Sequence, residues 1–482
     1  MIIRRALGLL VSILLIAAPR TAFAHAHLVK SAPTAGARIG TVPHVIQLWF
    51  SEAPEAALTV ITLTAANGQA IPLGMMTAAP NTPVSVMVAI DGALAPGDYT
   101  VTWRTVAADD GHPSNGNFSF TVTEVAGAAA ATTAQLRGPA AAVPEALNTG
   151  PKAGLRSGMD VESPVYVIIR WMSFTAIVLL IGVIVFRVLV LPRVGASDSA
   201  FAQASMHEVL SGTMIPGLAT LGLLAGLMVA IAAIGRLFAE QAVMAASMSM
   251  GLADIVLHMT WGSAWLLQIG AAVVACAGFA LARGRLAIGW SVAALAALVL
   301  AVTPALSGHA AAMPHLRTLA VTTDVVHVLA AGAWLGSLCA LVLVGLPSAI
   351  RTETRNASTG LMADMVNAFS PIALWFAAIV VLTGVISAWL RLGSVAALWR
   401  SSYGIVLLVK LALVGGVFGA GAFNWLRMRD ALGHAASDGS GSHSVSSSAS
   451  ARFRRSGTFE LVFGVLVLAA TAVLVAMPTP VH

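Results

Sequence analysis

The stretch "GDYTVTWRTVAADDGHPSNGNFSFTV", residues 97–122, shows what kind of domain begins this chain. Bulky side chains alternate with polar ones at Tyr99, Val101 and Trp103, and Phe118 and Phe120 repeat the pattern. A period of two residues is typical of β-strands that bury one face. The residues between the two runs include Asp-Gly and Pro, which favour turns. The stretch therefore predicts two strands joined by a turn.

Similar short runs precede this stretch and extend the β prediction. They are rich in Val, Ile, Thr and aromatic residues, and Gly, Pro, Asn and Asp separate them. The runs are "HVIQLWF", "ALTVITLTA" and "VSVMVAI", at residues 44–50, 57–65 and 84–90. About 100 residues of this kind fit a small sandwich or barrel. We therefore assign residues 25–124 to a β domain.

The first residues predict export of this domain. Arg4 and Arg5 precede an apolar run, and residues 22–24 read Ala-Phe-Ala, so we assign residues 1–24 to a signal peptide. Cleavage there would make His25 the first residue of the mature chain. The β domain contains no cysteine, so we expect no disulfide framework in it.

Beyond residue 160 the composition is typical of a membrane protein. The whole chain is 58% hydrophobic and 10% charged, with a mean hydropathy of +0.87, whereas soluble proteins carry about 25% charged residues. Residues 125–160 are rich in Ala, Gly, Thr and Pro and are predicted to form a flexible linker. Residues 161–480 then form an all-α membrane domain, because a bilayer is crossed by about 20 apolar residues. We expect eight transmembrane helices, at residues 164–191, 211–235, 252–281, 286–306, 318–346, 368–390, 403–425 and 457–477.

The arginines predict the orientation of these helices. Eleven fall in the connections after helices 1, 3, 5 and 7, and four fall in the opposite connections. Positive residues gather on the cytoplasmic side. We therefore expect a multi-pass bacterial inner-membrane protein whose β domain lies in the periplasm or outside the cell. The basic residues form no single patch, so we expect no nucleic-acid partner, and residues 436–450 are predicted to form a disordered cytoplasmic loop.

The mature N-terminus is a candidate metal site. His25 would offer an α-amine and an imidazole to one ion, and His27 could add a second imidazole. Asp110 and His112 flank a glycine just before the last strand, and that turn could present a carboxylate and an imidazole together. Asp-Gly is also an ordinary turn sequence, so His112 could instead be a surface loop residue. Nitrogen and oxygen ligands in a plane favour Cu(II).

With these residues in view, the first domain resembles the CopC copper-binding family. The resemblance is carried by "HAHLVKSAPTAGARI", "IQLWFSEAPE" and "GDYTVTWRTVAADDGHPSNGNFSFTV". It implies an immunoglobulin-like Greek-key β fold and a Cu(II) site made by His25, Asp110 and His112, with His27 as an extra or competing ligand. Some members carry a methionine-rich Cu(I) site that has no counterpart here, so we expect this domain to bind Cu(II) only.

Ionisable residues inside the apolar segments are the second set of candidates, because each costs about 2.5–3.5 kcal/mol to insert at a membrane centre. Asp324 and His327 are three residues apart in "TTDVVHVLAAGAWLG" and share a helix face. His258 is predicted to share a face with Trp261 and Trp265 in the same way. Two more histidines, His309 and His315, lie in the connection before Asp324 and could simply be solvated.

Several other residues keep two interpretations. Met244, Met248 and Met250 are placed in an outer loop, either as thioether ligands for Cu(I) or as apolar surface residues. Lys410 could extend toward the membrane surface or pair with Asp324 or another carboxylate. Cys276 and Cys339 could form a Cu(I) exit pair, or each could be a small buried apolar residue.

Residues 164–477 resemble the CopD membrane family. The carrying motifs are "SGHA", "TTDVVHVLAAGAWLG" and "YGIVLLVKLALV", followed by "FNWLRMR". The resemblance implies a multispan inner-membrane protein involved in copper uptake or resistance. It gives the membrane domain a reason to hold copper, including Cu(I) if thioether or thiol ligands take part.

These expectations describe a copper protein that is not an enzyme. The β domain would capture Cu(II), and the membrane domain would receive copper near His258, His309, His315, Asp324 and His327 and pass it inward. Its partners would be copper ions, the lipid bilayer and a periplasmic copper chaperone. Three alternatives stay open: sequestration or sensing without transport, a membrane redox protein whose haem is held by His258 and His327, and a histidine-brace copper monooxygenase.

Overall fold

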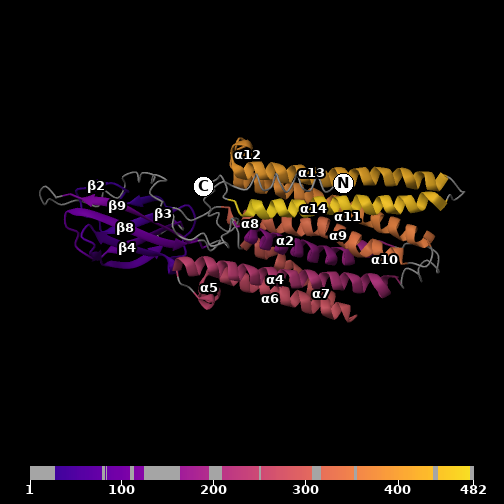
Figure 1. Ribbon diagram of the computed structural model, residues 1–482, viewed down its shortest axis with the longest axis horizontal. Helices are drawn as coiled ribbons and strands as arrows, with labels where there is room; N and C mark the ends of the chain where they lie inside the picture. Colours follow the sequence, from indigo (N-terminus) through magenta and orange to yellow (C-terminus); the bar gives the residue numbers. More distant parts are fainter. Residues whose placement is uncertain are drawn as a thin grey trace.

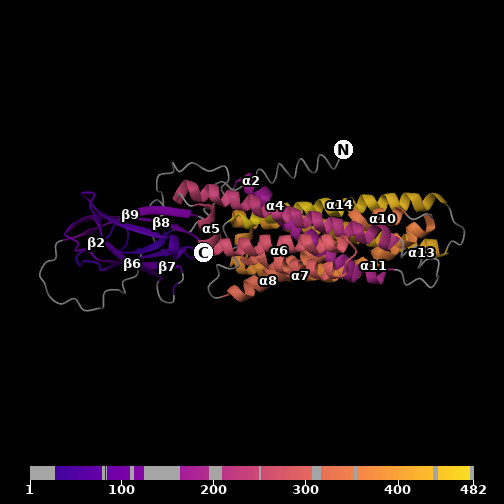
Figure 2. The ribbon, with the colours of Figure 1, turned by 90° about the horizontal axis from the view of Figure 1, so that it is seen from below.

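The computed structural model describes residues 28–78, 82, 84–108, 113–123, 163–194, 209–248, 251–306, 316–351, 355–437 and 443–477. A β domain and a helical bundle follow one another along the long axis of the molecule (Figures 1 and 2). The predicted signal peptide and linker lie outside the described residues, as do six candidate ligands: His25, His27, Asp110, His112, His309 and His315.

The β domain is a sandwich of two sheets. One sheet has four strands in the order β1-β3-β7-β6, and the other has five in the order β2-β9-β8-β4-β5. The strands are β1 (Leu28–Ala32), β2 (Arg38–Ile39), β3 (Val45–Phe50), β4 (Val60–Ala65), β5 (Ala70–Ile71), β6 (Leu73–Ala78), β7 (Ser85–Ile90), β8 (Gly97–Val106) and β9 (Pro113–Val122), with a 3-10 turn η1 (Ala56–Leu58). The chain crosses between the sheets several times, as sandwich folds require.

The alternation seen in the sequence builds the core of this sandwich. Tyr99, Val101 and Trp103 of β8 are at most 4% exposed, and burying a large apolar side chain contributes about 1.5–3 kcal/mol. The Trp103 ring meets Phe50 of the opposite sheet edge-on, with centroids 5.1 Å apart. The Tyr99 hydroxyl donates to the Ala95 carbonyl at 2.8 Å, which is the tyrosine corner of immunoglobulin-like sandwiches. The predicted fold class of this domain is confirmed.

The second part of the chain is a bundle of long helices. They are α2 (Pro164–Val185), α4 (Ile215–Met248), α5 (Leu252–His258), α6 (Thr260–Arg283), α7 (Ile288–Leu306), α8 (Arg317–Ala331), α9 (Ser337–Ala340), α10 (Leu346–Ile350), α11 (Arg355–Leu392), α12 (Ala397–Arg400), α13 (Ser402–Ser437) and α14 (His443–Val475). Short turns extend or interrupt these helices: η4 (Phe186–Val190), η6 (Leu210–Met214), η7 (Gly332–Gly336) and η8 (Leu341–Gly345) are π-helical, and η5 (Leu191–Arg193) is 3-10.

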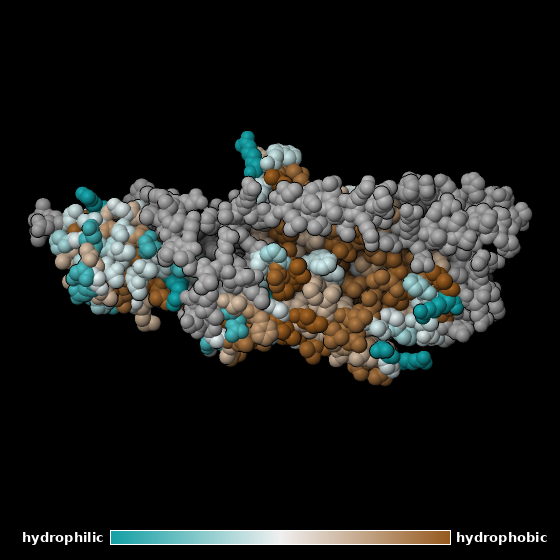
Figure 3. Space-filling model, viewed as in Figure 1, coloured by the Kyte–Doolittle hydropathy of each residue, from teal (hydrophilic) through white to brown (hydrophobic). Residues whose placement is uncertain are grey.

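The bundle has the length and surface of a membrane domain. Within the described residues, seven helices are long and apolar enough to cross a bilayer, and a shorter apolar stretch, Phe459–Val475, belongs to α14. Tyr166 near the start of α2 packs with Ala476 just beyond α14, so these two ends meet. That contact agrees with an even number of crossings. The bundle carries apolar side chains on its outer face, in contrast to the paler β domain (Figure 3).

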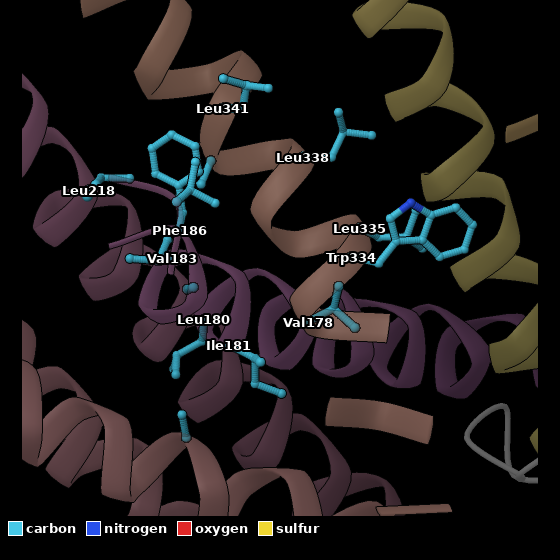
Figure 4. Close-up of a cluster of buried hydrophobic side chains, with 14 of the residues drawn as sticks. Val178, Leu180, Ile181, Val183, Phe186, Leu218, Trp334, Leu335, Leu338 and Leu341 are labelled. Atoms are coloured by element: carbon cyan, nitrogen blue, oxygen red, sulfur yellow. The ribbon is translucent and has the colours of Figure 1, made fainter. Parts of the chain in front are cut away.

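Helix α2 lies at the centre of the bundle. Val178 and Ile181 of α2 and Phe186 of η4 belong to the same buried apolar cluster as Trp334 of η7 and Leu338 of α9 (Figure 4). The backbones come close enough that a methyl group added at Gly182 would overlap Gly336. Small residues at such crossings are how membrane helices approach closely.

The structure corrects three sequence predictions about the helices. The segment predicted to begin at residue 252 is two helices, because Met259 is extended (φ −94°, ψ 144°) between α5 and α6. Met244 and Met248 lie within α4 rather than in a loop. The chain is helical up to Ser437 and again from His443, so residues 436–450 are not a continuous loop. The serines and alanines after His443 include no glycine or proline until Gly457, so nothing in that run breaks a helix.

Candidate functional site

The chain segments next to the four exported candidate ligands meet at one end of the sandwich. Leu28 begins β1 opposite Phe50, the last residue of β3. Just beyond Phe50, the Ala53 carbonyl accepts a hydrogen bond from the Ala108 amide at 2.8 Å. Pro113 pairs with the end of β8 to close the hairpin. The residues before Leu28 and those after Ala108 therefore leave the domain from the same end.

The two segments that contain the four candidate ligands join the described part of the domain at this end. His25 and His27 precede Leu28, while Asp110 and His112 lie between β8 and β9; all four are outside the described residues, so their role stays a prediction. Sequence reasoning missed Glu52, which is only 8% exposed at this end of the domain. The signal in the sequence was a carboxylate two residues after the strand that ends at Phe50. Carboxylates are rarely buried unless they are paired.

A polar cluster lies between α8, α11 and α13 inside the helical bundle, and Asp324 is its carboxylate. Arg391 of α11 donates from Nη2 to Oδ2 of Asp324, and Ser387 donates to Oδ1 at 3.1 Å. Tyr403 of α13 lies close enough to Arg391 to interact with it electrostatically. The ion pair is about one-fifth exposed on each side. The sequence left two interpretations of Lys410, one of which paired it with Asp324 or another carboxylate. The ion pair of Asp324 is made by Arg391 instead, because α11 extends to Leu392.

His327 is the second candidate ligand in this cluster. Its Nδ1 lies 2.9 Å from the hydroxyl of Thr383, a residue that is 6% exposed. The Thr383 hydroxyl is itself 2.7 Å from the Ile379 carbonyl, one helical turn back, and donates to it. A hydroxyl has one proton to donate, so Nδ1–H of His327 is the donor in the first bond. In the neutral ring, this leaves the lone pair of Nε2 as an acceptor or metal ligand.

The described part of the cluster carries more positive than negative charge. Lys410 of α13 lies near enough to interact electrostatically with Asp324 and Arg391, and His327 interacts with Lys410 and Arg391. The three formal charges are one carboxylate against an arginine and a lysine. Among the residues that the structure describes, no three His, Cys, Asp or Glu side chains come together as a metal site. A copper ion reaching Nε2 of His327 would therefore meet net positive charge.

The remaining candidates are spread over the bundle. His258 ends α5, which packs on α4 and α6, whereas α8 with His327 packs on α7 and α11. His258 and Trp261 were predicted to share a face of one helix. Because Met259 interrupts the helix between them, that helical spacing does not apply. This separation gives no support to a haem held by His258 and His327. Cys276 lies against Gly226 of α4, while Cys339 belongs to α9 on the far side of α2, so the fold supports no thiol pair.

Comparison with known families and proteins covers both parts of the chain. The CopC domain matches residues 28–123, the Copper resistance protein D-like N-terminal domain matches 159–318, and Copper resistance protein D matches 363–474. "Copper transport protein CutJ" of Bacillus subtilis is 24% identical over 96% of this chain and 76% of its own length. "Copper resistance protein D" of Pseudomonas syringae pv. tomato is 28% identical over 64% of this chain and 96% of its own length. "Copper resistance protein C" of Escherichia coli is 35% identical over 21% of this chain and 84% of its own length.

The fold and the comparisons together define the class: a β-sandwich metal-handling domain joined to a multi-pass helical membrane domain. The order of the matched regions, with CopC first and the two D-type regions after it, continues without overlap along the chain. The chain belongs to the family of CopC–CopD fusion proteins, and its function is related to copper transport or resistance.

Proposed function

We propose that this protein acquires copper outside the cytoplasm and passes it into or across the bacterial inner membrane. Its exported domain would bind Cu(II) through His25, Asp110 and His112, with His27 as a further ligand. The observation that carries this proposal is the meeting of Leu28, Ala108 and Pro113 at one end of the sandwich. Segments that leave from one end can bring amine, imidazole and carboxylate groups to one ion, which is a donor set suited to Cu(II).

The membrane step of the proposal uses the cluster around His327. The Thr383 bond leaves Nε2 of His327 as the ligand atom. Arg391 and Ser387 hold Asp324, and this carboxylate offsets only part of the positive charge of Arg391 and Lys410 that an arriving copper ion meets. His258, His309 and His315 stay candidate ligands on the route. A thioether on the route would hold Cu(I) only after a one-electron reductant from outside the chain had reduced the Cu(II). The proposed inward direction, the periplasmic placement of the β domain and the absence of enzymatic activity belong to the same proposal.

The test is cytoplasmic copper content at fixed external copper, in cells expressing the full chain or an empty vector. We expect the wild type to accumulate more copper than the vector, and His112→Ala and His327→Ala to fall back toward the vector level. His44→Ala is the matched control, since His44 is an exposed histidine of the same β domain. Accumulation no higher than the vector, with Cu(II) still bound by the purified chain, would contradict import and favour sequestration or sensing.

A further inference from the structure

Among the described residues, a buried apolar cluster joins the β domain to the helical bundle. Val106, the last residue of β8, is fully buried in a cluster with Met244, Ile255 and Trp261 of α4, α5 and α6. Leu58 of η1 packs against the same cluster from the β side. Each of the three helix residues is at most 2% exposed, so water is excluded from the contact. Strand β9 also approaches α4.

The contact occurs at the end of the sandwich that carries the candidate copper ligands. Val106 pairs with Pro113, and these two residues bracket the segment that contains Asp110 and His112. The Glu55 amide donates to the Val106 carbonyl at 2.7 Å, which ties the 51–55 segment beside β1 to the same place. The end of the sandwich that packs on the membrane domain is therefore the end next to the segment with the predicted copper ligands.

On the helix side of the contact, side-chain hydrogen bonds link the helices around Trp261. The guanidinium of Arg236 lies 5.7 Å from the ring centroid of Trp261. Arg236 donates to Gln268 at 3.3 Å, and Gln268 donates to Ser173 of α2 at 3.2 Å. Trp265 adds a bond from its indole nitrogen to the Ala233 carbonyl at 2.8 Å. These bonds link α2, α4 and α6 to one another.

The helix side of the contact also includes two methionines, whose thioethers can bind copper. Met244 is fully buried and Met259 is 4% exposed, and both belong to the same cluster as Val106. Thioethers pack as ordinary apolar groups, yet they are also copper ligands.

We propose that this contact is the position from which copper is delivered: the β domain docks its Val106 end on α4, α5 and α6, and copper enters the membrane domain there. The inference rests on the proposed function and adds a requirement to it. A flexible tether alone would already raise the local copper concentration at the membrane to about millimolar. A docked donor adds a fixed orientation, so breaking the contact lowers delivery even though the tether remains.

The experiment introduces a charged side chain into the buried contact and leaves the rest of both domains unchanged. Ile255→Asp places a carboxylate in the buried contact, and its matched control is Leu257→Asp, two residues along the same helix at a side chain that is 69% exposed. Val106→Asp does the same from the β side, with Val60→Asp on the adjoining strand as control, since Val60 is 47% exposed. Copper accumulation in cells, the amount of chain in the membrane fraction and the Cu(II) EPR spectrum of the purified full chain are measured for all four.

An unpaired carboxylate disfavours an apolar contact strongly, so we expect Ile255→Asp and Val106→Asp to lower accumulation about tenfold. The controls should match the wild type, and the EPR spectra should not change. Equal accumulation by Ile255→Asp and Leu257→Asp would overturn the inference while leaving import standing. If the wild type itself accumulates no more than the vector, the proposed function fails first and the inference with it. Should Val106→Asp lose its EPR signal, the Ile255 comparison alone decides.

Discussion

At the scale of single residues, the His327–Thr383 pair sets what the membrane cluster can do. Thr383 is buried, and its hydroxyl proton is directed to the Ile379 carbonyl, so its oxygen accepts from Nδ1–H of His327. Gly384 leaves room beside the ring, because a methyl group there would lie 3.6 Å from Cε1. The imidazole is thus fixed in tautomer and orientation by one hydroxyl. A metal-binding histidine is usually held in this way through its other nitrogen.

Thr383→Val tests this reading, because valine keeps the shape and removes the acceptor. The buried Nδ1–H would lose its partner, and an unsatisfied buried donor costs about 1–3 kcal/mol. We expect a lower midpoint of thermal unfolding in detergent together with reduced copper accumulation. Thr383→Ser keeps the hydroxyl and should retain most of both properties. Accumulation that is equal in the Val and Ser variants would show that His327 does not act through this tautomer.

Sequence patterns predicted the candidates in this cluster but not their partners. Asp324 and His327 could be selected because ionisable residues are costly in an apolar segment. Their bonds to Arg391 and Thr383 depend on how α8 packs against α11, which no local spacing in the sequence encodes. Hydropathy also placed Arg391 in a loop, because it detects only the apolar part of a helix. The helix continues beyond that part as long as its backbone hydrogen bonds are made.

At the scale of elements, strands were easier to predict than helix breaks. The runs that became β3, β4, β7, β8 and β9 alternate or are rich in β-branched residues, and their bounds agree to within a few residues. β1, β2, β5 and β6 were not predicted. β2 and β5 are two residues long, and "LVKSA" and "LGMMTA" carry Ser, Lys or Gly where a core strand has branched residues. The break at Met259 also escaped, since a hydropathy count registers length and ignores a single extended residue.

The crossing of α2 with η7 gives a prediction about packing. A methyl group added at Gly336 would overlap the Val178 carbonyl oxygen and approach the Gly182 Cα at 2.9 Å. Backbone atoms cannot move aside as side chains do, so Gly336→Ala must push the two helices apart. We expect a loss of about 1–3 kcal/mol in stability, as for other overpacked cores, measured as a lower unfolding midpoint in detergent.

Gly270→Ala is the matched control for that crossing. Gly270 lies in α6, is exposed, and has nothing within 4 Å of the added methyl group. Alanine has the higher helix propensity, so this variant should be neutral or more stable by up to about 1 kcal/mol. If both variants behaved alike, the close approach of α2 and η7 would not be what holds the centre of the bundle.

At the scale of the whole molecule, three observations point to one orientation in the membrane. The β domain packs on the ends of α4, α5 and α6. The far end of α6 carries Arg283, followed by Arg285, and positive residues favour the cytoplasmic side. Tyr166 at the start of α2 meets Ala476 beyond α14, so the chain enters and leaves the bundle at the same face. The apolar stretch of α14 is shorter than the other spans. The contact between Tyr166 and Ala476 nevertheless implies that α14 crosses the membrane.

Cysteine labelling can test that orientation in the full chain, after Cys276 and Cys339 are replaced by alanine. Met75→Cys reports the β domain at a side chain that is 89% exposed, and Leu286→Cys reports the α6–α7 turn at 52% exposed. A cysteine added after His482 reports the C-terminus. With the outer membrane permeabilised, a membrane-impermeant maleimide should label the first and third sites and leave Leu286→Cys unlabelled until the cells are lysed. Protection of the third site would mean that α14 does not cross, which would leave an odd number of spans and place the C-terminus opposite the β domain.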